Sequence, residues 1–263
     1  MGKRTLRLDA AVADRGGITR SQAHSLILEG RVRVDGAVAT KAGASVRPEA
    51  RIEIERPRRF VSRGGEKLER ALDAFGIDVA GFDALDVGAS TGGFTDCLLQ
   101  RGAAAVTAVD VGYGQLDWRL RNDPRVRVLE RTNFRLLPDD AFPAGFDLIA
   151  IDASFISLRT ILARAVAYRR PAGLVVALVK PQFEAGRERL GSGGVVRDAA
   201  VHRAVLRETR EAVAALGLVP AALEESPLTG PAGNREFLLL ARAGGESLDD
   251  ARIEAVVGER TLP

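Results

Sequence analysis

Residues 83–94 read Asp83-Ala-Leu-Asp-Val-Gly-Ala-Ser-Thr-Gly-Gly-Phe94, and this stretch decides the expected fold. Its apolar first half predicts the end of a buried parallel strand, and residues 94–101 predict the helix that follows. Gly88, Gly92 and Gly93 allow a tight turn and a close approach of a ligand to the backbone, because glycine has no Cβ. A strand, a glycine turn and a helix form the first half of a nucleotide-binding crossover.

Two carboxylates indicate which nucleotide this crossover binds. Asp86 lies two residues before the first glycine, where it would repel a pyrophosphate but suit an ammonium group. Asp110 ends the next apolar run, residues 104–109, where a carboxylate commonly holds ribose hydroxyls. The glycine spacing also departs from the dinucleotide pattern GxGxxG. S-adenosylmethionine carries an amino group, a sulfonium and no phosphate, so we expect it in preference to NAD or to an empty turn.

Composition predicts a soluble cytoplasmic protein without a metal site. The 263 residues suffice for one large domain and a small one. No apolar run approaches the length of a membrane span, and we expect no secretory signal. The single cysteine, Cys97, cannot form an internal disulfide and fits a reducing cytoplasm. One cysteine and two histidines also argue against a protein-bound zinc ion.

Basic residues are distributed unevenly along the chain. Residues 1–60 carry 13 Lys and Arg against 7 Asp and Glu, whereas the remainder carries 25 against 28. A basic front piece on a mildly acidic body predicts a polyanion-binding module. Only four basic residues are lysines, and Lys67 and Lys180 are the two beyond residue 41. A lysine in a crowded, partly dry site can give up its proton, whereas an arginine cannot, so both are candidates for proton chemistry. Composition alone leaves ordinary surface lysines equally open.

Residues 1–55 predict a small α+β module. A short amphipathic helix from residue 7 and a second helix over 22–29 precede an alternating strand, Arg-Val-Arg-Val-Asp-Gly at 31–36. The run from Ser21-Gln-Ala through Gly30 to this strand resembles the alpha-L RNA-binding domain, which a small-subunit ribosomal protein shares with many RNA-modifying enzymes. The resemblance implies phosphate contacts by arginine. The expected RNA-binding residues are Arg7, Arg15, Arg20, Arg31 and Arg33, with Arg58 and Arg59 of the linker 56–61. The alternative is a folded domain whose arginines only keep it soluble.

Residues 62–243 predict an α/β domain with a doubly wound, Rossmann-like sheet. Strands are expected at 126–129, 146–151 and 174–179, followed by a long helix at 197–216 and an antiparallel hairpin of strands 218–223 and 236–241. Such sheets bind ligands outside the carboxyl ends of their parallel strands.

Four charged residues are expected at that edge of the sheet. Asp152 and Lys180 directly follow two parallel strands, and Glu236 begins the antiparallel strand. Lys67 arrives from the first turn of a helix over 66–75, where a cation opposes the helix dipole. The spacing therefore predicts a Lys-Asp-Lys-Glu cluster beside the methyl donor.

Five motifs together resemble the TlyA/hemolysin-A family. They are Gly-Gly-Glu-Lys-Leu at 64–68, Gly-Ala-Ser-Thr-Gly-Gly-Phe-Thr at 88–95, Asp-Ala-Ser-Phe-Ile-Ser-Leu at 152–158, Val-Lys-Pro-Gln-Phe-Glu at 179–184 and Gly-Asn-Arg-Glu at 233–236. The resemblance covers both domains and the linker, and only residues 244–263 form a tail without a recognised pattern. Family members are similar to ribosomal RNA cytidine 2′-O-methyltransferases of the FtsJ-like type.

The resemblance implies a function for named residues. The catalytic set would be Lys67, Asp152, Lys180 and Glu236. The residues expected to bind the donor are Asp86, Gly88, Ser90, Thr91, Gly92, Gly93, Phe94, Asp110, Asn133 and Phe155. A ribose 2′-hydroxyl is a poor nucleophile, and an amine within hydrogen-bond reach can take or orient its proton, for which Lys180 is the first candidate. The implied partner is ribosomal RNA or a ribosomal subunit. The nucleotide, the subunit and the oligomeric state stay open.

Other functions fit the sequence less well. Carbon-5 base methylation needs a cysteine nucleophile, and Cys97 lies in a helix where a core position is more typical. Residues 152–155 do not match the Asn/Asp-Pro-Pro-aromatic strand end of amino-group methylation. A membrane-active hemolysin is suggested by the family name, but the aromatic content of 5% and the lack of a span argue against stable membrane association. A non-catalytic ribosome-binding assembly factor is a further alternative.

Overall fold

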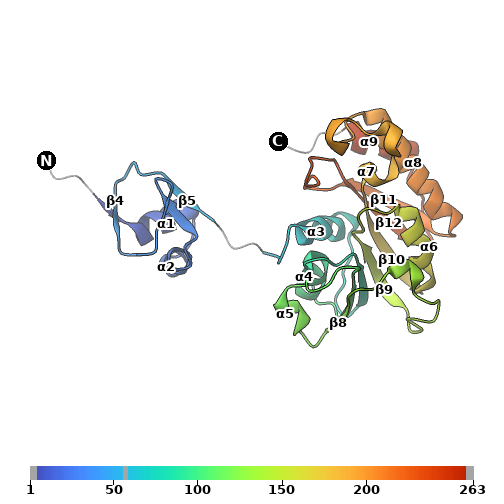
Figure 1. Cartoon of the computed structure of the whole chain (residues 1–263), viewed down its shortest axis with the longest axis horizontal. Coiled ribbons are helices and arrows are strands. Elements are labelled where there is room, and N and C mark those ends of the chain that lie inside the picture. Colours follow the sequence, from blue (N-terminus) through green and yellow to red (C-terminus); the bar gives the residue numbers. More distant parts are fainter. Residues whose placement is uncertain (1–4, 56–58, 259–263) are drawn as a thin grey trace. The chain divides into compact units, whose positions relative to one another are not determined.

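The computed structural model describes residues 5–55 and 59–258, which belong to two compact units, residues 1–59 and 60–263 (Figure 1). Residues 56–58 of the predicted linker, including Arg58, lie outside the described residues. The expected fold class, a doubly wound α/β sheet with a small N-terminal α+β domain, is confirmed. The expected division of the chain at residues 55, 61 and 243 stays a prediction.

The first unit packs two helices on short strands. Its elements are β1 (Leu6–Arg7), α1 (Leu8–Gly16), α2 (Arg20–Leu28), β2 (Val32–Val34), β3 (Ala37–Val38), β4 (Ser45–Val46) and β5 (Ile52–Ile54). Strand β2 lies between β3 and β5, and β1 pairs with β4. Helix α2 is capped by Thr19, whose side chain accepts a hydrogen bond from Gln22 N, while Thr19 N donates one to the Gln22 side-chain oxygen. The fully buried Leu8, Val12 and Ile27 hold the helices together.

The second unit is a sheet covered on both faces by helices. Its elements are α3 (Gly64–Phe75), β6 (Asp83–Val87), α4 (Gly93–Gln100), β7 (Ala105–Val109), α5 (Trp118–Arg121), β8 (Val126–Leu129), η1 (Phe134–Leu136), β9 (Phe146–Ile151), α6 (Leu158–Ala167), β10 (Arg169–Val179), α7 (Pro181–Glu184), η2 (Arg187–Arg189), η3 (Ser192–Gly194), α8 (Ala199–Ala215), β11 (Val219–Glu225), β12 (Phe237–Arg242) and α9 (Asp250–Gly258). The strand order is β11-β12-β10-β9-β6-β7-β8. Strands β6 to β10 are parallel, and β12 runs antiparallel to both of its neighbours.

Each strand divides its side chains between two cores. On β10, Val175, Ala177 and Val179 pack with α6, α8 and α9, whereas Val176 and Leu178 pack with α3 and α4. Figure 1 shows these two groups of helices on opposite faces of the sheet. Because both faces are buried, the strands are continuously apolar, and this property made them visible in the sequence.

The glycine turn after β6 is tight for a steric reason. Gly88 has a φ of +86°, and a Cβ there would lie 2.7 Å from the backbone oxygen of Asp152. Gly92 has a φ of +95°, and a Cβ there would lie 2.3 Å from a side-chain carbon of Leu120. The first glycine lets the turn approach the end of β9, and the second lets α5 pack on the turn.

Two stretches differ from the expectation. Strand β10 begins at Arg169 and not at residue 174, with a register shift against β9 between Arg169 and Leu174. The Arg169 guanidinium donates to three backbone oxygens within this irregular segment, which sequence periodicity does not reveal. Part of the predicted tail 244–263 forms α9, whose Ile253 and Val257 are buried in the core.

Candidate active site

A cavity of about 440 Å³ opens at the carboxyl edge of the parallel strands. Five of the ten predicted donor-binding residues line it, namely Gly88, Ser90, Asp110, Asn133 and Phe155. Its wall also includes Gln115, Thr132 and Ser154, which no sequence pattern indicated because they lie in loops without periodicity. Asp152 of the predicted catalytic set lines the same cavity, so the expected donor site and part of the expected catalytic set adjoin each other.

The Asp110 carboxylate fixes the ends of two loops. Its Oδ2 accepts a hydrogen bond from Ser90 N at 2.8 Å, and its Oδ1 accepts one from Gly112 N at 2.6 Å. Each oxygen can accept a further hydrogen bond, because a carboxylate can accept about four. A carboxylate held by backbone amides at the end of the second strand is well placed to accept from two ribose hydroxyls.

Asp86 lies beneath the glycine turn and not in the cavity wall. It is fully buried, and its Oδ2 accepts from both the amide and the hydroxyl of Thr95, at 2.9 and 2.6 Å. Burial raises the pKa of Asp86 to about 7. Its Oδ1 has no hydrogen-bond partner among the described residues. The side chain therefore ties β6 to the start of α4, and its direct contact with a donor ammonium stays a prediction.

Four other predicted donor residues shape the turn without lining the cavity. They are Thr91, Gly92, Gly93 and Phe94. The Thr91 carbonyl accepts from Asp117 N at 3.2 Å, and Phe94 is buried in the core with α3. A Cβ on Gly93 would lie 2.8 Å from the backbone nitrogen of Gly65 in α3, so this glycine lets α3 and α4 meet. These residues hold the turn that carries Gly88 and Ser90.

Two ion pairs, one buried and one partly buried, contain the four predicted catalytic side chains. Lys67 Nζ lies 2.5 Å from Glu236 Oε2, and Lys180 Nζ lies 2.5 Å from Asp152 Oδ1. Lys180 Nζ also donates to the Ser154 hydroxyl at 2.7 Å. Glu236 is only 1% exposed, and both lysines are buried. Lysines are almost never buried unless paired, and here each buried lysine has a carboxylate partner.

Strand register brings the two pairs to one edge. The last residue pair between β10 and β12 is Val179 with Phe237, so Lys180 and Glu236 both lie directly beyond it. Asp152 follows β9 in the same way, and its amide donates to the Val87 carbonyl at 3.0 Å. The predicted antiparallel direction of the last strand places Glu236 beside the ends of the parallel strands.

The loop between β9 and α6 is held in a strained form. Phe155 has a φ of +63°, which is unusual for a bulky residue, and the residue is 91% exposed. The ring centroid lies 5.1 Å from that of Phe183 in α7. Glu184, also in α7, accepts hydrogen bonds from the Ser157 hydroxyl at 2.8 Å and from Leu158 N at 2.6 Å. Helix α7 therefore positions the loop that carries Asp152 and Ser154.

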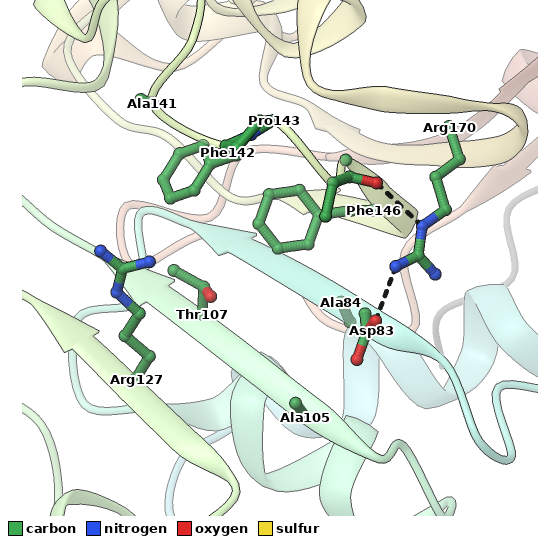
Figure 2. Close-up of a pocket in the computed structure, with 12 residues that line it drawn as sticks. Asp83, Ala84, Ala105, Thr107, Arg127, Ala141, Phe142, Pro143, Phe146 and Arg170 are labelled. Carbon is green, nitrogen blue, oxygen red and sulfur yellow. Dashed lines mark hydrogen bonds and ion pairs between the residues drawn. The ribbon is translucent and has the colours of Figure 1, made fainter.

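A second cavity, of about 210 Å³, lies at the opposite edge of the sheet (Figure 2). Figure 2 shows Arg170 at its rim, where the guanidinium donates to Asp83 at 2.7 Å and to the Ala144 carbonyl at 3.2 Å. None of the predicted site residues lines this cavity. Arg170 has a structural role there, because it joins the loop before β9 to the start of β6.

The predicted RNA-binding arginines of the first unit also make contacts within it. Arg7 and Arg20 both pair with the buried Asp9, and the Arg7 guanidinium holds the pKa of that carboxyl well below its usual range. Arg15 donates to the carbonyls of Pro48 and Ala50, both at 2.6 Å. Arg31 pairs with Glu29 at 2.9 Å, and Arg33 donates to Gly36 O at 3.2 Å. Arg7, Arg15, Arg20, Arg33 and Arg59 are nevertheless exposed.

Comparisons with known families cover nearly the whole chain. The profile of the FtsJ-like methyltransferase family matches residues 60–243, and that of the S4 domain matches residues 6–52. The 16S/23S rRNA (cytidine-2′-O)-methyltransferase TlyA of Mycobacterium tuberculosis is 47% identical over 263 residues, covering 96% of this chain and 98% of that protein. Hemolysin A of Brachyspira hyodysenteriae is 39% identical over 235 residues, covering 89% and 98%.

A solved structure shares the fold of the whole chain. The structure titled "Putative hemolysin from Streptococcus thermophilus" has a TM-score of 0.74 and 40% sequence identity, and it covers 98% of this chain and 96% of its own. Residues 5–55 and 59–258 contain no helix with the length and hydrophobicity needed to cross a bilayer.

Proposed function

Because this chain belongs to the FtsJ-like methyltransferase family and carries an S4 domain, we propose that it methylates a ribose 2′-hydroxyl of ribosomal RNA, with S-adenosylmethionine as the methyl donor. The TlyA relative is named for cytidine 2′-O-methylation of 16S and 23S rRNA, so cytidine is the proposed nucleotide. The observation that carries the proposal is that two Lys–carboxylate pairs lie at the sheet edge where the cavity opens, with Asp152 of one pair in the cavity wall.

The cavity fits the chemical groups of the proposed donor. Asp110 offers carboxylate oxygens for the ribose hydroxyls, and Asn133 and Phe155 provide a polar and an aromatic surface. Gly88 keeps the floor of the turn clear of a Cβ. When bound, S-adenosylmethionine supplies an activated methyl group, so the residues of this chain need only place the acceptor oxygen in line with it and manage the proton.

Lys180 is the residue proposed to take or orient the proton of the acceptor hydroxyl. Its Nζ is held between Asp152 and Ser154, 2.5 and 2.7 Å away, so the amine has a defined position. Asp152 lines the cavity and joins this amine to the donor side. Lys67 and Glu236 form the second pair, which would help to orient the ribose.

The exposed arginines of the S4 unit are the proposed RNA contacts. Arginine forks match phosphate geometry, and the contacts of Arg7, Arg15 and Arg20 within the unit hold their side chains in place before RNA arrives. Ribosomal RNA or a ribosomal subunit is the proposed partner, and the cytoplasm is the proposed location, since that is where a bacterial ribosome is modified.

Methyl transfer to ribosomal particles tests this function directly. The purified protein is incubated with labelled S-adenosylmethionine and with each ribosomal subunit, and modified riboses are mapped by mass spectrometry. We expect label at a ribose 2′ oxygen with the wild type and its loss with Lys180→Arg, which keeps the charge but cannot give up a proton. The control is Arg159→Lys, at an exposed ion pair on α6. Wild-type transfer by Lys180→Arg and Lys180→Ala would contradict the assigned role, and label on a base would contradict the proposed reaction.

A further inference from the structure

Helix α9 lies beyond the part of the chain that the FtsJ-like profile matches, residues 60–243. Its last turn is nevertheless tied to the residue next to Glu236. Arg235 Nη1 donates to the Val257 carbonyl at 2.9 Å, and Nη2 donates to the Val256 carbonyl at 3.0 Å. These carbonyls belong to the C-terminal end of α9, where the unsatisfied oxygens and the helix dipole favour a cation.

The same guanidinium also forms a fork with Glu225. Arg235 Nε and Nη2 lie 2.7 Å from the two carboxylate oxygens of Glu225, which is only 7% exposed. Glu225 is the last residue of β11 and pairs across the hairpin with Phe237, the first residue of β12. The guanidinium carbon lies 5.4 Å from the centre of the Phe237 ring. Arg235 thus joins β11, β12 and α9 at one point, and a bidentate pair of this kind has a defined geometry.

The position of Glu236 depends on the contacts of Arg235, because Glu236 lies just outside the strand ladder. The first paired residue of β12 is Phe237, and the Glu236 backbone is held through its carbonyl, which accepts from Ser226 N at 2.9 Å. The side chain is 1% exposed and meets Lys67 at 2.5 Å. A rotation of the chain at residue 235 would swing the Glu236 carboxylate away from Lys67.

We infer that α9 positions the catalytic pair of Glu236 and Lys67 through Arg235. The carbonyls at the end of α9 and the carboxylate of Glu225 fix the Arg235 guanidinium, and the guanidinium fixes the backbone at the start of β12. Arg235 is a positioning residue, since its own contacts lead to Glu225, Val256 and Val257. The inference rests on the catalytic role proposed above for Glu236.

Substitution of Arg235, with steady-state kinetics on ribosomal particles, tests the inference. Arg235→Gln should lower kcat by about tenfold to 100-fold, because small displacements of a catalytic group are that costly. The KM for S-adenosylmethionine should stay within about twofold, because Arg235 does not line the donor cavity. The kcat of Arg235→Lys should lie between those of the wild type and Arg235→Gln, since lysine keeps the charge but cannot reproduce the planar fork.

Arg252→Gln is the matched control. Arg252 also links α9 to the hairpin, through the Leu223 carbonyl at 2.9 and 3.1 Å and through Glu224 at 3.2 Å, but it lies away from Glu236 in the sequence and in its contacts. We expect this variant to lose a similar amount of thermal stability and to keep kcat within about twofold.

Three outcomes would overturn the inference or its premise. Wild-type kcat in a folded Arg235→Gln variant would refute it, and so would an equal loss of kcat in Arg252→Gln, because α9 would then act through stability alone. If Arg235→Gln does not fold, Glu225→Gln weakens the same fork from its other side and is subject to the same expectations. Glu236→Gln with wild-type kcat would instead refute the proposed catalytic pair, whatever Arg235→Gln does.

Discussion

The buried pair of Lys67 and Glu236 allows a quantitative prediction about stability. In Lys67→Met the aliphatic stem is kept and the amine is lost, so the Glu236 carboxylate stays buried at 1% exposure without its cation. Among the described residues, the other side-chain donor to this carboxylate is Gln182 Nε2, at 3.5 Å from Oε1, which is too far for a strong hydrogen bond. Removal of one partner of a buried ion pair costs about 3–5 kcal/mol.

We expect a loss near the lower end, about 3 kcal/mol, because the Lys67 side chain keeps 11% exposure and water reaches the pair from that side. In a unit of this size about 3 kcal/mol corresponds to a fall in Tm of about 6–12 °C. The double variant Lys67→Met/Glu236→Gln buries no charge, so its stability should return to within about 1 kcal/mol of the wild type. Neither variant should transfer methyl groups.

Urea unfolding followed by circular dichroism measures the free energies, with Lys41→Met as the control at an exposed lysine of the other unit. We expect the control to stay within about 0.5 kcal/mol of the wild type. A single variant as stable as the wild type would refute the reasoning. So would a double variant no more stable than the single one, because burial of an unpaired charge would then not be the cause.

Three further predictions concern the glycine turn, the buried aspartate and the RNA contacts. Gly88→Ala places a Cβ 2.7 Å from a backbone oxygen at a φ of +86°, so thermal denaturation should show a loss of about 1–3 kcal/mol, whereas Gly244→Ala, with open space around it, should change little. The pKa of Asp86 is raised to about 7, so between the unfolded-state value and pH 7 the folded state holds the proton that the unfolded state has lost, and wild-type stability falls as pH rises through this window. Asp86→Asn should therefore gain stability relative to the wild type from pH 4 to pH 7, by up to about 1.4 kcal/mol per pH unit. Urea unfolding measures the free energy of unfolding against pH, and parallel curves for the variant and the wild type would contradict this prediction. Filter binding measures the slope of log affinity for ribosomal RNA against log salt concentration, and Arg33→Ala should reduce this slope by about 1. The control is Arg159→Ala in the other unit. An unchanged slope in Arg33→Ala, or an equal change in the control, would argue against a phosphate contact of Arg33.

Local chemistry explains which parts of the site could be predicted from the sequence. Asp152 and Lys180 follow continuous apolar strands, and the ends of parallel strands meet at one edge of a sheet, so their proximity follows from the pattern. Asp110 is visible for the same reason. Gln115, Thr132 and Ser154 line the cavity from loops, where no period relates a residue to its position in space. The full burial of Asp86 was not visible in the sequence, because a strand-end side chain has two possible directions, and its contact with the donor stays a prediction.

By itself the sequence determined the sheet, its carboxyl edge, the glycine turn and the identity of the four charged residues, since each depends on local periodicity, on backbone sterics or on residue type. Tertiary structure alone decided which lysine meets which carboxylate, the contact of Arg235 with the end of α9, and the inclusion of residues 250–258 in the core. The physical reason is sequence separation. Lys67 and Glu236 are 169 residues apart, so their contact follows from how β12 joins the sheet and how α3 packs on it, and no local pattern encodes either.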